Sequence, residues 1–178
     1  MVDPRTLRRI GYAALYVAIC LGLMIYNILP IDLQAGTIPG PDLMLCVTFA
    51  WVLRRPRWVP VLLIAAMFLV ADLMFMRPPG LWAALVVLAS EYLRNHDNGG
   101  GELTFGNEML MVAATILTIS LADRLVLSLL LVDQVPVRLT LLQFLTTIVA
   151  YPVVVLISHL GLGVRKMSPT EDALEARL

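Results

Sequence analysis

The sequence predicts an all-α integral membrane protein with six transmembrane helices and both chain ends in the cytoplasm. First, hydrophobic residues make up 60% of the chain and charged residues only 15%, with a mean hydropathy of +0.86, which a soluble domain does not reach. Second, six apolar runs are separated by short polar or Gly/Pro-containing segments. Third, Lys and Arg concentrate in alternate connections, which is the charge bias that orients membrane proteins.

The first predicted helix covers residues 10–29, about the 20 residues needed to cross a hydrocarbon core. Ala14, Ala18 and Gly22 recur every four residues on one face, so another helix could approach closely there. Packing within the chain is the simpler interpretation of this stripe. A loop with no Lys or Arg follows the helix.

The second predicted helix, 43–53, is too short to cross alone unless the loop before it dips toward the membrane. Asp42 precedes it and is placed to cap its amino end. The basic turn Arg54, Arg55 and Arg57 follows. The simplest interpretation of this turn is that its charges only determine the orientation of the helices in the membrane.

The third predicted helix, 58–76, holds Asp72 within an apolar run, where a carboxylate normally faces a partner or a polar cavity. A Pro-Pro-Gly turn leads to the fourth helix, 81–93. A flexible cytoplasmic loop is expected at 95–107 because it is polar and glycine-rich. The remaining predicted segments are helices at 109–132 and 137–160 and a cytoplasmic tail at 165–178.

The basic residues define the predicted topology. On the side of the chain ends the sequence places Arg5, Arg8, Arg9, Arg54, Arg55, Arg57, Arg94, Arg165, Lys166 and Arg177. The opposite side receives only Arg77 and Arg138. The positive-inside rule therefore places both ends in the cytoplasm. A five-helix arrangement would destroy this pattern.

Asp72, Asp123 and Arg124 are expected at a similar depth near the outer leaflet, from their positions along outward-running helices. An intramembrane ion pair between Asp72 and Arg124 is the resulting hypothesis; a structural pair or snorkelling to the surface is the simpler alternative. No catalytic triad, paired catalytic carboxylates or metal-ligand spacing is found in the sequence. We therefore expect no enzyme, cofactor or metal, and no nucleic-acid partner, because the net charge is zero.

Three short motifs resemble the rod shape-determining protein MreD family. They are Pro41-Asp42-Leu43-Met44-Leu45, Trp51-Val52-Leu53-Arg54-Arg55-Pro56, and Asp72 followed by Pro79-Gly80. The chain departs from that family where a glycine usually precedes the aspartate and where Gly80 follows two prolines. The family's six-helix layout is similar to the substrate-binding components of energy-coupling-factor vitamin transporters, and Ala14 and Ala18 fit the Ala-x-x-x-Ala contact of their first helix.

The resemblance implies a non-enzymatic subunit of the cell-elongation (rod) complex in the bacterial inner membrane. Its partners would be an MreC-like periplasmic protein and, indirectly, an MreB-like filament and peptidoglycan synthases, all serving cell shape. Pro41, Asp42, Asp72, Pro79 and Gly80 would position the MreC-like partner. The basic turn would face anionic lipid or inner partners. The alternative is a vitamin-type binding subunit of a transporter, with an outward pocket near Asp72.

Overall fold

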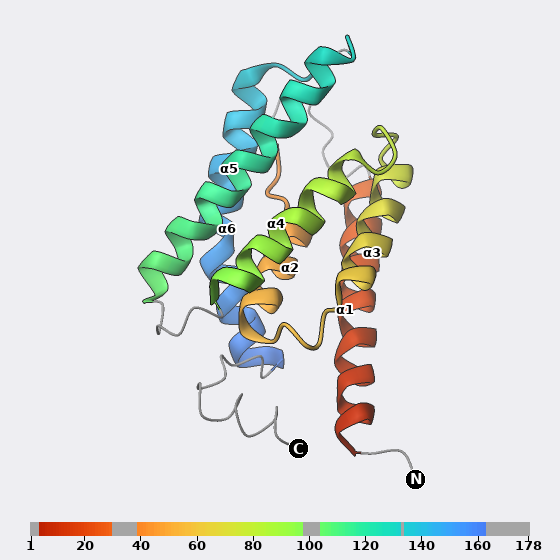
Figure 1. The fold of residues 1–178 in the computed structure, drawn as a ribbon, viewed down its shortest axis with the longest axis vertical. Helices are drawn as coiled ribbons and strands as arrows, with labels where there is room; N and C mark the ends of the chain where they lie inside the picture. Colours follow the sequence, from red (N-terminus) through yellow and green to blue (C-terminus); the bar gives the residue numbers. More distant parts are fainter. Residues whose placement is uncertain (1–3, 30–38, 98–103, 133, 163–178) are drawn as a thin grey trace.

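The computed structural model describes residues 4–29, 39–97, 104–132 and 134–162. Six α-helices and no β-strand occur in this part of the chain, as the sequence predicts (Figure 1). They are α1 (Pro4–Ile28), α2 (Leu43–Arg54), α3 (Val61–Met74), α4 (Leu81–Asp97), α5 (Phe105–Leu129) and α6 (Val137–Leu162). The start of α1 and the end of α6 lie at the same end of the molecule (Figure 1).

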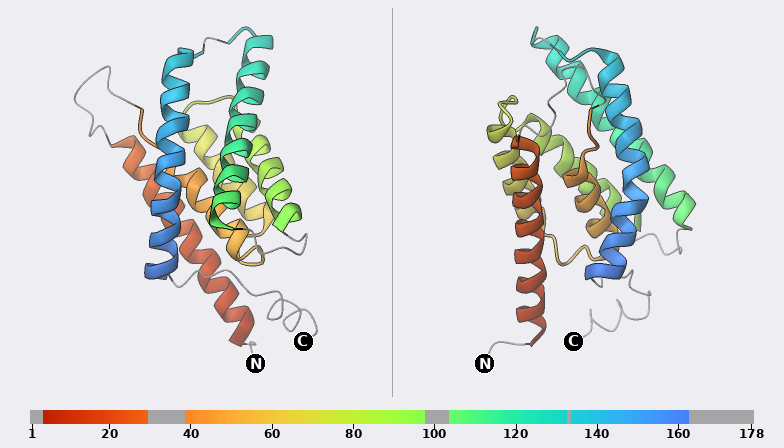
Figure 2. Two further views of the ribbon diagram at one scale, coloured as in Figure 1. Left: turned by 90° about the vertical axis from the view of Figure 1, so that its left-hand side faces the viewer. Right: turned by 180° about the vertical axis from the view of Figure 1, so that it is seen from behind.

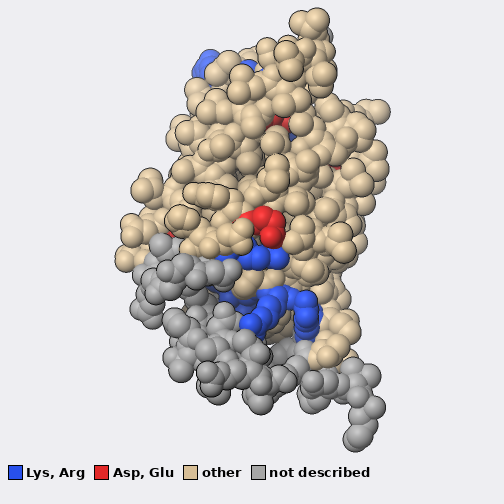
Figure 3. Space-filling model, in the orientation of Figure 1, with Lys and Arg blue, Asp and Glu red and all other residues tan. Residues whose placement is uncertain are grey.

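Three of these helices are long and apolar enough to cross a membrane, namely α1, α5 and α6. Their qualifying stretches have 20, 25 and 25 residues. This indicates a membrane protein. Lys and Arg gather toward the lower end in Figure 3, with a smaller group at the upper end and a mostly uncharged band between them.

The third helix is shorter than the expected span 58–76. Helix α3 begins after Pro60, whose ring nitrogen cannot donate, and it ends at Met74, two residues before Met76 adopts a positive φ of 53°. Its 14 residues reach only about 21 Å, less than a hydrocarbon core about 30 Å thick. Like α2, it is therefore too short to cross alone.

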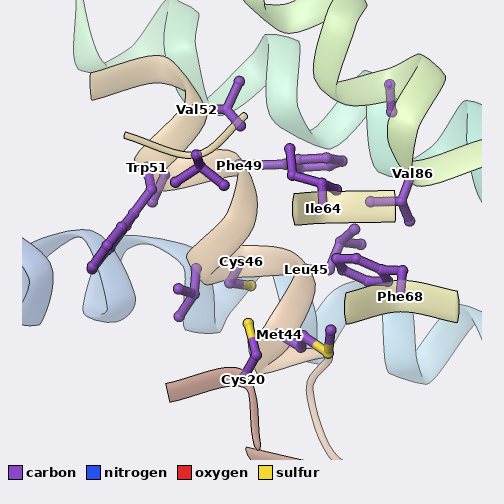
Figure 4. Packing of buried hydrophobic residues seen from close by; sticks show 14 of the residues in the cluster. Cys20, Met44, Leu45, Cys46, Phe49, Trp51, Val52, Ile64, Phe68 and Val86 are labelled. Carbon is purple, nitrogen blue, oxygen red and sulfur yellow. The ribbon is translucent and has the colours of Figure 1, made fainter. Parts of the chain in front are cut away.

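Helix α2 lies at the centre of the bundle, with α1, α4 and α6 packed against it (Figure 2). Every residue from Met44 to Arg54 is buried. Trp51 and Phe49 of α2 are completely buried, and Figure 4 shows α2 side chains meeting Phe68 of α3 and Val86 of α4. Since protein covers its sides, this 12-residue helix has no need to match the thickness of a bilayer.

Hydrogen bonds fasten both the start and the middle of α2 to its neighbours. The Asp42 carboxylate accepts from the Leu45 amide at 2.9 Å, so the predicted cap is confirmed. The Asp42 amide donates to the Thr147 hydroxyl of α6 at 3.0 Å. In the middle of the helix, the hydroxyls of Tyr16 and Thr48 lie 2.8 Å apart and join α1 to α2. The Asp42 amide bond to Thr147 and the contact between these two hydroxyls thereby fix the position of α2 between α1 and α6.

The loop expected at 95–107 is shorter than predicted. Helix α4 continues to Asp97 and α5 begins at Phe105, after Thr104 at its N-cap. Extending the helices is favourable because each added residue forms another hydrogen bond between a backbone N–H and a backbone C=O group. Residues 98–103 of this loop and the expected tail 165–178 lie outside the described residues.

Candidate functional site

Asp72 is completely buried and holds the start of α4. Its Oδ2 accepts hydrogen bonds from the backbone amides of Gly80 and Ala83, each at 3.1 Å. Gly80 is the residue before the helix, and it has no side chain to cap the free amides of the first turn. The carboxylate of α3 therefore acts as the cap for α4, next to the positive end of its dipole.

This geometry contradicts the expected ion pair between Asp72 and Arg124. The Arg124 guanidinium instead donates to the Thr140 hydroxyl at 2.6 Å and to the Val135 carbonyl at 3.1 Å. The two residues are held apart because each has closer partners at the start or end of a helix. Asp72 is also unavailable as a surface contact for another protein.

A polar cavity of about 390 Å³ lies beside the start of α4, at the end where α5 leads into α6. Four charged residues line it: Asp42, Arg77, Asp123 and Arg124. Uncharged polar side chains add hydrogen-bonding capacity, namely Ser120, Gln134, Thr140, Gln143 and Thr147. The predicted outer-leaflet residues Asp123 and Arg124 thus meet Asp42 of the α2 cap in one cavity.

A second cavity of about 320 Å³ shares Asp42, Arg77, Trp82 and Gln143 with the first. It extends toward the end of α1 and is also lined by Pro39, Gly40 and Pro41. Of the five residues predicted to bind a partner, Pro41 and Asp42 therefore lie on cavity walls. Pro79 is exposed in the turn before α4, and Gly80 is bonded to Asp72.

An apolar groove of about 870 Å³ runs between α1 and α6, with α2 as its floor. Ile19 and Leu23 form the α1 side, and Val47 and Trp51 belong to the floor. The α6 side is formed by Leu145, Thr146, Val149, Ala150, Val153, Val154, Ile157, Ser158 and Gly161. Its nearly complete lack of polar lining suits a hydrocarbon surface rather than a polar solute.

The small-residue stripe of α1 points away from the bundle. Ala14, Ala18 and Gly22 are exposed, and a β-carbon added at Gly22 would meet nothing within 4 Å. At 3.6 residues per turn, the stripe lies nearly opposite the buried Tyr16 and Cys20. The interpretation that it packs within this chain is therefore wrong.

A buried ion pair joins α2, α5 and α6 near the opposite end of the bundle. The Arg54 Nη1 lies 2.8 Å from Glu108 Oε1, and the side chains are 8% and 4% exposed. The Tyr151 hydroxyl donates to the same carboxylate oxygen at 2.7 Å, and Arg54 also donates to the Ala50 carbonyl at 3.3 Å. Both charges suit their helix ends, because Arg54 is in the last turn of α2 and Glu108 in the first turn of α5.

Sequence reasoning missed this pair because it assigned Arg54 to the basic turn, while Glu108 fell between the expected loop 95–107 and the expected helix 109–132. The correction affects only part of the turn. Arg57 is exposed, and the Arg55 guanidinium lies 4.8 Å from the ring centre of Trp58. The signal that could have found the pair is Glu108 itself, four residues after the possible cap Thr104 and next to an apolar run.

Among the described residues there is no group of three His, Cys, Asp or Glu side chains that could hold a metal ion. No protein-family model, curated protein or solved structure matches this chain.

Proposed function

We propose that this protein is a non-enzymatic scaffold of the bacterial inner membrane that docks the membrane-spanning helix of a partner in the apolar groove between α1 and α6. The observation that carries this proposal is the groove itself, whose lining is apolar except for Thr146 and Ser158. A hydrocarbon-facing groove between helices offers a contact surface to another helix in lipid, where close packing rather than water exclusion drives association.

The dimensions of the groove favour a helix as its occupant. Its α6 side runs from Leu145 to Gly161, a distance of about 24 Å at 1.5 Å per residue. That is most of a hydrocarbon core about 30 Å thick, so one helix crossing the membrane would lie along the groove. Ala150 and Gly161 on this side are small enough for the backbones to approach closely.

The sequence motifs around Asp42 and Asp72 suggest the partner. Their resemblance to the MreD family favours an MreC-like protein, and through it an MreB-like filament and peptidoglycan synthases in a cell-elongation complex. The layout would then be that of six transmembrane helices, similar to the energy-coupling-factor substrate-binding fold, with both ends cytoplasmic. The Arg55 and Arg57 side of the basic turn would face anionic lipid.

A photo-crosslinking amino acid at Val149, inside the groove, tests this proposal in native membranes. The matched control is Leu125 of α5, which is as exposed as Val149 and does not line the groove. We expect the Val149 probe to form an adduct with the membrane-spanning peptide of an MreC-like protein, identified by mass spectrometry, and the Leu125 probe to form much less. Adducts with lipid alone, or equal protein adducts at both positions, would refute helix docking.

A second function is favoured by the polar cavity around Asp42 and Arg77, because polar lining suits a small molecule more than a helix. The protein would then be a vitamin-type binding subunit of a transporter. A mild-detergent pull-down separates the two functions. Recovery of an ATPase pair with a coupling membrane subunit, in place of an MreC-like protein, would select the transporter.

A further inference from the structure

The polar cavity is formally neutral, although it is lined by four charged side chains. Asp42 and Asp123 supply two carboxylates, and Arg77 and Arg124 supply two guanidinium groups among the described lining residues. Two of the four already have partners, because Asp42 caps α2 and Arg124 binds Thr140 and Val135. The remaining two, Arg77 and Asp123, are the charged groups that could bind a ligand.

Arg77 and Asp123 have no hydrogen bond or ion pair from their side chains within the described part of the chain. They line the same cavity and attract each other electrostatically, but no hydrogen bond or close ion pair joins their side chains in the described part of the chain. The Arg77 guanidinium lies over two rings, 5.6 Å from the centre of Phe75 and 5.7 Å from that of Trp82. These contacts orient the cation through its face and leave its N–H groups able to donate to an oxyanion.

Trp82 gives a second, independent indication of a binding site. Its Nε1 is buried and finds no acceptor among the described residues, although Trp82 lines both polar cavities. A buried indole N–H normally has a partner. Near the Arg77 guanidinium, an acceptor oxygen on a bound molecule would serve both donors.

We propose that this cavity binds a zwitterion, a molecule with a primary ammonium group and an oxyanion a few bonds apart. The oxyanion would bind Arg77 and the Trp82 Nε1, and the ammonium group would bind Asp123. A ligand with only one charge would engage only one of these two residues, either the half-buried Asp123 or the exposed Arg77. Two sources share this chemistry, a free solute and the headgroup of phosphatidylethanolamine.

Isothermal titration of the full chain in a maltoside detergent tests the proposal. The probes are phosphoethanolamine as the free solute and dihexanoyl-phosphatidylethanolamine as the lipid. Dihexanoyl-phosphatidylglycerol carries only the anion, and dihexanoyl-phosphatidylcholine has no ammonium N–H. We expect at least one ethanolamine probe to bind about tenfold more tightly than both comparison lipids, because one charge-assisted hydrogen bond is lost in each.

The variants Arg77→Gln and Asp123→Asn should each weaken binding of the ethanolamine probe by about tenfold or more. Arg138→Gln is the matched control, since Arg138 is exposed and does not line the cavity. Near-ultraviolet circular dichroism and size-exclusion profiles like those of the wild type show that each variant is folded.

Binding of phosphoethanolamine supports a solute site, and binding of the lipid alone supports a headgroup site. No binding of either, equal binding of the comparison lipids, or unchanged affinity in folded Arg77 and Asp123 variants would overturn the proposal. The inference depends on the cavity and not on the groove, so it stands or falls separately from docking of a partner helix.

Discussion

Replacing Glu108 by Gln should strongly destabilise the bundle, because it leaves the Arg54 guanidinium buried without a counter-charge. Glu108 Oε1 accepts from Arg54 at 2.8 Å and from Tyr151 at 2.7 Å, and both charged side chains are less than a tenth exposed. Removing one member of such a buried pair costs about 3–5 kcal/mol. That is a large fraction of a typical total stability of about 5–15 kcal/mol.

The double variant Arg54→Met/Glu108→Met separates the effect of the ion pair from the effect of altered packing. Both replacements are apolar and of similar size, so we expect the double variant to lose much less stability than the sum of the losses in Arg54→Met and Glu108→Met. A loss of about 1–3 kcal/mol should remain, because the buried Tyr151 hydroxyl no longer has its acceptor. The smaller change Tyr151→Phe should cost about 1.5–3 kcal/mol, the value of a hydrogen bond to a charged group.

The free energy of unfolding can be measured by titrating sodium dodecyl sulfate into mixed micelles and following circular dichroism. Arg138→Met serves as the control because Arg138 is exposed, and it should change stability by no more than about 0.5 kcal/mol. If Glu108→Gln is as stable as this control, or the two single losses simply add in the double variant, the network does not behave as a buried ion pair.

Two further variants test the start of α4 by the same unfolding assay. Asp72→Ala should lower the free energy of unfolding by about 2–3 kcal/mol, because the buried amides of Gly80 and Ala83 lose their acceptor. Since Asp72 is buried, this variant should retain its partner as well as another variant of equal stability does. A larger loss of partner would show that Asp72 contacts the partner. Gly80→Ala should lower the free energy of unfolding by about 1–2 kcal/mol, because residue 80 has a φ of +88°, which is strained for any residue with a β-carbon. The added β-carbon itself would not clash, since its nearest neighbour is Leu69 at 4.0 Å. An unchanged stability would show that the backbone of this turn relaxes.

The positions of the helices could be predicted from the sequence because the signals are local. Apolar runs bounded by Pro, Gly and charged residues locate all six helices, and the place of Asp42 before an apolar run identifies it as a cap. The largest difference at one end is six residues, at the start of α1, because its polar first turns precede the apolar run; at α3, apolar residues before Pro60 were counted as helical. The docking groove and the polar cavity had no such local signal, since each combines residues from three or more separate segments.

The sequence by itself determined that this chain is a bundle of apolar helices, because composition and run length govern whether a segment can leave water. Only the tertiary structure decided that α2 is the buried centre, that Arg54 pairs with Glu108 and that Asp72 caps α4. The physical reason is that a run of apolar side chains is equally compatible with lipid and with protein around it. Packing between residues far apart in the chain decides whether lipid or protein surrounds each helix. It therefore also decides which polar groups come into contact.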